Sequence, residues 1–210
     1  MKKALAIGLL GLALAGCPTQ VPPQVLSEWQ GRTLYTCCNL HYEGASVSDA
    51  NYLVGSTLPF GTPASVLKMT GNSITIHAGA TDLTLGHSYG SAQESAEQYF
   101  NKVLVPTDPH SVFATYPKDV QTAIENSHVE VGMTKPQVLL SLGYPPTHRT
   151  ASIDLNTWTY WYNRWLTYEV HFGDNGKVVG FIGNAPTTNQ PILELKPTPA
   201  PAPRKSGKKK

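Results

Sequence analysis

The sequence predicts an α+β protein in which a small antiparallel β-barrel is followed by a domain of two helices and a three-stranded antiparallel sheet. Short strand patterns separated by Gly- and Pro-containing turns occupy residues 31–90, which is typical of a small barrel. Helical spacing of apolar residues follows at 118–126 and 135–142, and strand patterns then continue to residue 182. A chain of 210 residues can hold two modest cores of this kind.

The first unit, residues 31–90, is expected to consist of short strands. It begins with a long alternation, and one face of that strand would carry Leu34, Thr36, Cys38, Leu40 and Tyr42. Three further strands are expected at Val66–Met69, Ser73–His77 and Asp82–Leu85. The phrase Leu-Pro-x-Gly-Thr-x-x-x-Val at 58–66, which begins with a turn segment, resembles the central part of bacterial SH3-like modules, which implies an SH3-like barrel over residues 31–89.

Residues 91–116 are expected to form a helical connector. Ser91 and Glu94 have the spacing of a capping box that would open its helix. That helix would bury Ala96, Tyr99, Phe100 and Val103. The next helix, 118–126, would turn Val120, Ala123 and Ile124 inward and lead into the second unit.

The second unit, residues 117–185, has the clearest local signals. Thr134 and Gln137 have capping-box spacing, and Gly143 supplies a left-handed stop ahead of Pro145-Pro146. The helix between them would bury Val138, Leu139 and Leu142. One face of the first strand would carry Trp158, Tyr160 and Tyr162, and one face of the second Leu166, Tyr168, Val170 and Phe172. Asp174–Gly176 would then turn the chain into a third strand, 177–182.

Taken in order, four segments of this unit resemble the BamE/SmpA/OmlA family of small outer-membrane lipoproteins. They are Gly-Met-Thr-x-x-Gln-Val at 132–138, Leu-Gly-x-Pro at 142–145, Trp-x-Tyr at 158–160 and Val-x-Phe-x-Asp-x-Gly at 170–176. The resemblance implies a non-enzymatic protein with a structural or partner-binding role in outer-membrane protein assembly and envelope integrity. The implied partners are subunits of the assembly machinery or other envelope proteins.

The N-terminal residues have the pattern of an export signal. Lys2 and Lys3 precede the apolar run Ala4–Ala13, which is too short to anchor stably across a bilayer. Leu-Ala-Gly-Cys at 14–17 resembles the bacterial lipobox, which implies removal of residues 1–16 and lipidation of Cys17. The alternative is an ordinary signal peptide with a coincidental cysteine. Pro18 is not the Asp of an inner-membrane retention signal, which by resemblance implies the periplasmic face of the outer membrane.

Two linkers and an uneven charge distribution complete the plan. Residues 17–30 are expected to be a lipid tether, extended from Pro18 to Ser27, and residues 186–210 a disordered Pro-rich tail. Eight basic and fourteen acidic residues leave 17–195 with a charge of −6, whereas 196–210 carries +6. The tail would bind anionic lipid or lipopolysaccharide, or serve only as a solubilising extension; no nucleic acid is expected. Its basic residues are Lys196, Arg204, Lys205, Lys208, Lys209 and Lys210.

A catalytic motif is present in an unsuitable context. Residues 86–90, Gly-His-Ser-Tyr-Gly, match the G-x-S-x-G nucleophile elbow, and Asp154 and His171 follow Ser88 in the order of a hydrolase triad. That fold needs a largely parallel sheet of apolar strands, whereas the preceding residues are typical of hairpins. We therefore expect no catalytic residue. A serine hydrolase ranks third, after the envelope lipoprotein and a free-standing binding module for cell-wall peptide or glycan.

A metal site is the next alternative. Zn²⁺ ligands could come from Cys37, Cys38, His41, His77 and His87. Adjacent residues of a strand point to opposite faces, so Cys37 and Cys38 would not share an ion, and a disulfide between them is equally disfavoured. We therefore expect no metal and no cofactor, with Cys38 serving as a small core residue.

The densest aromatic segment, residues 158–165, offers a candidate surface. Strand alternation would place Trp161 outward, with Arg164 and Trp165 beside it. Exposed Trp next to Arg is typical of a partner or lipid contact. The alternative is that Trp161 covers a neighbouring helix or the barrel domain, since aromatic stripes at strand spacing are mostly core.

Overall fold

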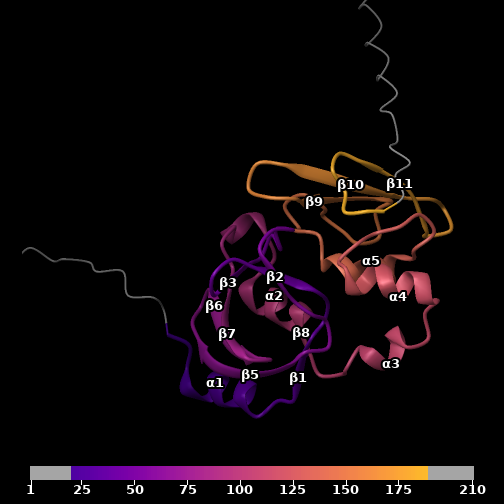
Figure 1. Cartoon of the computed structure of the whole chain (residues 1–210). Helices are drawn as coiled ribbons and strands as arrows, with labels where there is room; N and C mark the ends of the chain where they lie inside the picture. Colours follow the sequence, from indigo (N-terminus) through magenta and orange to yellow (C-terminus); the bar gives the residue numbers. More distant parts are fainter. Residues whose placement is uncertain (1–19, 189–210) are drawn as a thin grey trace, which may run out of the picture.

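The computed structural model describes residues 20–188 and contains two hydrophobic cores. Cys17 and the basic residues from Lys196 to Lys210 lie outside the described residues. Between residues 20 and 188, no helix is both long and apolar enough to cross a bilayer. The architecture is α+β, as the sequence predicts, with one body built on a curled sheet and the other on a flat sheet with a helix pair (Figure 1).

The first body is a curled six-stranded sheet with the order β3–β7–β6–β5–β1–β8 (Figure 1). Its strands are β1 Leu34–Thr36, β3 Ser46–Ser48, β5 Pro63–Met69, β6 Ser73–Ala78, β7 Thr81–Gly86 and β8 Leu104–Val105. The predicted strands at 66–69, 73–77 and 82–85 are thus confirmed. The sheet is mixed, however, because β3 pairs in parallel with β7. It is a half-barrel, and the prediction of a purely antiparallel barrel was wrong because β3 joins a distant strand and not a hairpin neighbour.

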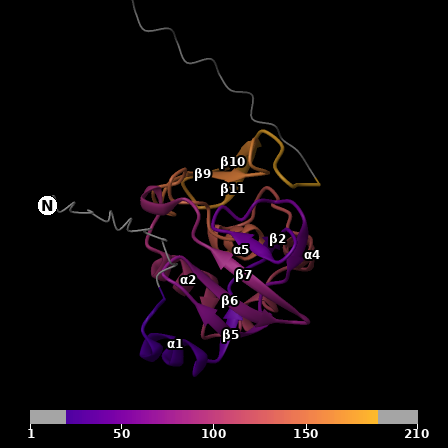
Figure 2. The same cartoon turned by 90° about the vertical axis from the view of Figure 1, so that its left-hand side faces the viewer.

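Two helices pack on this sheet. Helix α1, Pro23–Gln30, lies against β5 (Figure 2) and buries Trp29, so the expected extended tether is helical from Pro23 onward. Helix α2, Ala96–Val103, buries Tyr99, Phe100 and Val103 as expected. Its capping box is Ser95 with Gln98, one turn later than the predicted Ser91 and Glu94, because residues 90–92 form a 3₁₀ turn. Since β8 follows at once and pairs with β1, most of the predicted connector belongs to the first body.

The predicted continuous strand from Leu34 to Tyr42 is broken. Strand β1 ends at Thr36, and β2, Leu40–Tyr42, pairs with β4, Ser56–Leu58, in a separate two-stranded sheet. Between them Cys37 and Cys38 form a disulfide, which the sequence had disfavoured. That prediction was wrong because it assumed an extended chain, whereas the chain bends here and the two sulfurs lie on the same side.

The second body is a helix pair beneath a three-stranded antiparallel sheet (Figure 1). The short helix α3, His110–Phe113, leads to α4, Lys118–Glu125, and α5, Lys135–Leu142. The sheet, in the order β11–β10–β9, consists of β9 Thr157–Trp161, β10 Thr167–Phe172 and β11 Val178–Ile182. The core contains Trp158, Tyr160, Tyr168, Val170 and Phe172, as predicted. Leu166 was placed wrongly, because it precedes β10 and is 49% exposed.

Helix α5 begins and ends where the sequence predicts. The Gln137 side chain accepts a hydrogen bond from the Thr134 amide at 2.8 Å, and Gly143 ends the helix with a φ of +76°. Its buried face contains Val138 and Leu142 as expected, but Leu140 is buried more deeply than Leu139.

Candidate functional site at the joint between the two cores

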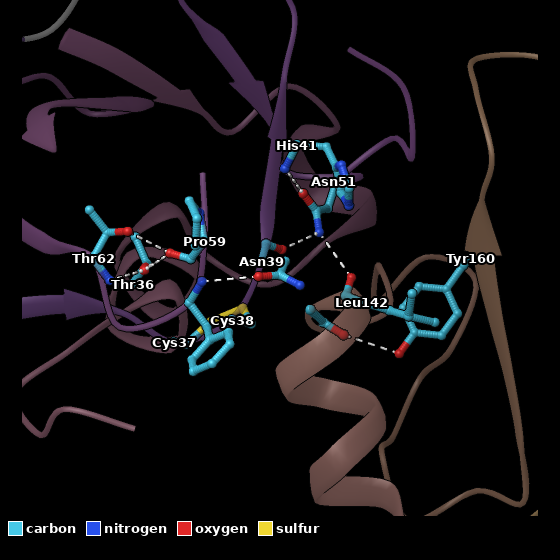
Figure 3. Close-up of a disulfide and its surroundings, with 12 residues drawn as sticks. Thr36, Cys37, Cys38, Asn39, His41, Asn51, Pro59, Thr62, Leu142 and Tyr160 are labelled. Atoms are coloured by element: carbon cyan, nitrogen blue, oxygen red, sulfur yellow. Dashed lines mark hydrogen bonds between the residues drawn. A yellow bond between two sulfur atoms is a disulfide. The ribbon is translucent and has the colours of Figure 1, made fainter. Parts of the chain in front are cut away.

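A buried asparagine joins the two bodies (Figure 3). Asn39 follows the disulfide and is 1% exposed. Its backbone N–H donates to the Leu140 carbonyl at 3.1 Å, and its side-chain amide donates to the Ile124 carbonyl at 2.6 Å and the Ser127 hydroxyl at 3.1 Å. The Asn39 side-chain oxygen accepts the Phe60 N–H at 3.0 Å. One residue of the first body thus binds both helices of the second.

A second asparagine completes this joint. Asn51 has a φ of +44°, a left-handed conformation that asparagine tolerates better than most residues. Its side-chain oxygen accepts the His41 N–H at 2.8 Å, and its amide donates to the carbonyls of Asn39 at 3.1 Å and Leu142 at 2.9 Å (Figure 3). Sequence reasoning missed both asparagines, because nothing local marks a partner about ninety residues away. We use "the joint" for Asn39, Asn51 and these bonds.

A cavity of about 430 Å³ opens beside the joint. Its lining is polar, with hydroxyl groups, one acid and one guanidinium: His41, Glu43, Ser46, Ser48, Tyr52, Val54, Ser88, Tyr89 and Arg164. The hydroxyl groups of Tyr52 and Tyr89 hydrogen-bond each other. Burial, together with this bond, raises the pKa of Tyr52, so its phenol is a neutral donor and acceptor at pH 7. The cavity can therefore hold a small polar ligand.

His41 separates this cavity from a second one of about 550 Å³ on the other side of β2. The ring is 6% exposed, and its Nδ1 lies 3.3 Å from the Thr57 hydroxyl. Its Nε2 is buried and has no hydrogen-bond partner among residues 20–188. Burial lowers the pKa of His41 to about 4, because the charged imidazolium is poorly solvated in this site. His41 is therefore neutral at pH 7.

The hydrolase residues are not brought together. The amides of Ser88 and Tyr89 donate to the buried Asp49 carboxylate at 3.0 and 3.2 Å, which fixes this loop at the cavity. His171 on β10 already contacts the Thr157 hydroxyl at 3.2 Å and the Glu169 carboxylate at 3.0 Å. Throughout residues 20–188, no hydrogen bond connects the Ser88 side chain to His171 or to Asp154.

The predicted aromatic surface is divided in two. Trp161 is half-buried and donates from Nε1 to His148 Nε2 at 3.2 Å, while the Arg149 guanidinium lies 4.6 Å from its ring centre. Its edge also contacts Tyr52 of the first body, with ring centres 6.4 Å apart. Trp161 therefore covers the barrel domain, the second of the two alternatives. Trp165, in contrast, is 81% exposed.

His148 is a site residue that sequence reasoning missed. Its ring stacks on Tyr89 with centres 4.4 Å apart, and its Nδ1 is buried with no hydrogen-bond partner in the described part of the chain. Burial, with a smaller contribution from Arg149, lowers the pKa of His148. A neutral ring is what the bond from Trp161 requires, since Nε2 must be unprotonated to accept it.

The residues of the metal alternative are dispersed. Cys37 and Cys38 are joined to each other, His77 pairs with Asp82 at 2.7 Å, and the ring of His87 hydrogen-bonds the Glu94 carbonyl at 2.6 Å. In the described part of the chain, no group of three or more His, Cys, Asp or Glu side chains is placed to hold an ion.

Comparison with known proteins adds no relative: no family model, curated protein or solved structure matches the chain. The fold and the site define it as an α+β protein of two cores with a polar cavity beside their joint.

Proposed function

We propose that the chain is a non-enzymatic lipoprotein on the periplasmic face of the outer membrane, with a structural or partner-binding role in outer-membrane protein assembly and envelope integrity. The observation that carries the proposal is the ordered set of BamE-like segments, which lie at the two ends of α5, on β9, and on β10 with the turn that follows it. The lipobox ending at Cys17 supports the compartment. The Cys37–Cys38 disulfide supports it too, because disulfides persist mainly in oxidising compartments.

The turn between β9 and β10 offers the best surface for a protein partner. The Asn163 side chain accepts the N–H groups of Trp165 and Leu166 at 2.8 and 3.0 Å, which holds the turn and presents Trp165 to solvent. Arg164 is exposed beside them. An exposed Trp next to Arg and Leu has the composition of a binding hot spot. Because the backbone of this turn is already fixed, its ordering costs little entropy on association.

The test is affinity purification of the detergent-extracted protein. Subunits of the assembly machinery should co-purify with the unmodified chain. The affinity for the partner should fall at least about thirtyfold for Trp165→Ala, in line with a hot-spot loss of about 2 kcal/mol or more, and recovery should fall with it. Val179→Ala is the matched control, because Val179 is also an exposed apolar residue but lies on β11. Recovery of no envelope protein with the unmodified chain would refute the proposal.

Anchoring is tested separately. Cys17→Ala should leave an uncleaved or soluble protein that no longer partitions into detergent, because the lipidation site is gone. Mass spectrometry of the purified chain should show a lipid-modified residue 17 at the mature N-terminus. An unmodified N-terminus would contradict the assignment to the outer membrane.

The cavity favours a second candidate, a free-standing binding module for cell-wall peptide or glycan. Serine hydroxyls, two tyrosines, Glu43 and Arg164 around about 430 Å³ suit a small ligand with many hydrogen-bonding groups. Calorimetric titration with cell-wall fragments distinguishes the two functions, since only the binding module predicts saturable heat.

The hydrolase alternative requires Ser88 to react stoichiometrically with a fluorophosphonate probe, and we expect no labelling.

A further inference from the structure

The bend between β1 and β2 connects the disulfide directly to the joint (Figure 3). The Cys37 N–H donates to the Val103 carbonyl of the first body at 2.9 Å, and the Asn39 N–H donates to the Leu140 carbonyl of the second at 3.1 Å. Cys38, between them, is 1% exposed and lies close to Gly143, the residue that ends α5. Three consecutive residues therefore contact α2, the end of α5 and the interior of α5.

The Cys37–Cys38 disulfide is incompatible with an extended conformation of these two residues. In a strand, neighbouring side chains point to opposite faces, so two adjacent cysteines can be joined only where the strand is interrupted. The alternation from Leu34 to Tyr42, in contrast, favours one continuous strand. Once the disulfide is removed, the local sequence favours a straight strand, whereas the joint requires the bend. A straight strand would turn Asn39 away from the carbonyls that it now binds.

We propose that Cys37–Cys38 is a thiol–disulfide exchange site whose oxidation state controls the joint between the two cores. In the oxidised chain the bend holds Asn39 against Leu140, Ile124 and Ser127. In the reduced chain the bend is released and the joint loosens, while each core keeps its own packing. The proposal does not depend on the protein's partner or on its membrane anchor.

The exchange partner is a dithiol reductant. Cys37 is half-buried whereas Cys38 is 1% exposed, so Cys37 is the more accessible of the two residues to a reductant. A thiolate of the reductant bonds to the Cys37 sulfur, the Cys37–Cys38 bond breaks, and Cys38 leaves as a thiolate that takes a proton from water. The second thiolate of the reductant then attacks its own sulfur in the mixed disulfide and releases the Cys37 thiolate, which is protonated in turn. The reductant is oxidised by two electrons and ends as a disulfide.

The test uses the full chain carrying Cys17→Ser, which leaves Cys37 and Cys38 as its only cysteines. Alkylation should modify neither residue before treatment with dithiothreitol and both after it. Amide hydrogen exchange should then accelerate at least about tenfold at Asn39, His41 and Phe60, whose N–H groups are bonded within the joint. Amides of the β9–β10 ladder, residues 157–172, should keep their protection.

The double variant Cys37→Ser with Cys38→Ser is the matched control. It should exchange rapidly at the joint without reductant and should not respond to dithiothreitol. Free thiols in the untreated chain would overturn the proposal, as would unchanged exchange at the joint after reduction. Equal acceleration in residues 157–172 would overturn it as well, because the bond would then support the whole fold and not the joint. A response of the double variant to the reductant would assign the effect to something other than the bond.

Discussion

At the scale of single residues, environment decides the role of chemically identical side chains. Trp158 and Trp165 lie seven positions apart, yet the first is 0% exposed and the second 81%. Trp158 donates from Nε1 to the Ile153 carbonyl at 3.1 Å and packs on Phe172, with ring centres 4.6 Å apart. Trp165 has its backbone held by Asn163 and its indole in solvent.

Replacement of these two tryptophans should therefore lower the stability by very different amounts. Trp158→Ala should lower the free energy of unfolding by about 3–5 kcal/mol, because it leaves a cavity in the second core. Trp165→Ala should change it by less than about 0.5 kcal/mol, as expected for an exposed side chain. Urea unfolding monitored by circular dichroism measures both. Equal destabilisation by the two changes would mean that the β9–β10 register is wrong.

The buried His41 predicts a pH dependence of stability. Its pKa is about 4 in the folded chain and about 6.5 when unfolded, so between these values the unfolded chain binds more protons. The free energy of unfolding should be highest above pH 6.5 and fall by about 3 kcal/mol as the pH decreases towards 4, then level off. The lowered pKa of His148 acts in the same direction.

The contribution of His41 can be isolated by substitution. His41→Gln removes the titrating group, so the decrease in unfolding free energy between pH 7 and pH 4.5 should be smaller than in the unmodified chain. Urea titrations at pH 7, 6, 5 and 4.5 give the free energy of unfolding at each pH. Its change with pH can then be compared between the two proteins even if their absolute stabilities differ. Parallel slopes would show that His41 is not held neutral in the folded state.

At the scale of elements, the end of α5 determines how the bodies meet. Gly143 follows Leu142, whose carbonyl accepts the Asn51 amide, and the Gly143 carbonyl itself accepts the Tyr160 hydroxyl at 3.1 Å (Figure 3). A Cβ at Gly143 would lie 2.8 Å from the Asn51 side-chain nitrogen. Asn51 cannot move away without losing its bonds to Asn39 and Leu142.

Gly143→Ala should consequently lower the free energy of unfolding by more than backbone strain alone would. Gly176 provides a reference for a positive φ, because its φ is +70° and no atom of residues 20–188 lies within 4 Å of its added Cβ, whereas Gly143 combines a φ of +76° with a ψ of −173°. Gly176→Ala should cost about 1–2 kcal/mol from the left-handed conformation. Gly143→Ala should cost about 1–3 kcal/mol more, the usual penalty of overpacking. Thermal and urea unfolding measure the difference, and equal values would mean that the joint has room to adjust.

At the scale of the whole molecule, the buried side-chain amides of Asn39 and Asn51 join two separate cores. A second feature at this scale is the division of charge between an acidic body and a basic tail. Buried hydrogen bonds of Asn39 and Asn51 are costly to leave unmade, so the two bodies should unfold together. The residues of both cores lie between Val21 and Ala185. The segment from Lys196 onward consists largely of Pro, Ala and basic residues, which is not the composition of a core.

Deletion of Lys196–Lys210 tests the role proposed for the tail. The unfolding midpoint should not change, because a segment of Pro, Ala and basic residues cannot build a core. Binding of the non-lipidated chain to anionic phospholipid vesicles should weaken, since each basic residue near such a surface contributes about 1 kcal/mol. Moderate salt should weaken binding of the intact chain in the same way. Equal binding of both chains at low salt would leave the tail as a solubilising extension.

Local signals predicted much of the fold and little of the site. The stop at Gly143, the turn at Asp174–Gly176 and the inward face of β10 depend on neighbouring residues, so periodicity and turn chemistry were sufficient. The capping box before α2 was misplaced by four residues, because Ser91 and Ser95 both offer a suitable hydroxyl. Asn39, Asn51 and His148 could not be identified, because their partners are distant in the chain.

The sequence by itself determined the α+β class, the helix pair with its three-stranded sheet, and the charge division between body and tail, since each follows from short-range pattern or composition. Only the tertiary structure decided that the chain bends at Cys37–Cys38, that β3 pairs in parallel with β7, and that Trp161 covers the first body. The physical reason is that these features depend on which surfaces meet when two cores pack. A local preference, such as the alternation from Leu34 to Tyr42, is overruled where a long-range contact stabilises the chain more.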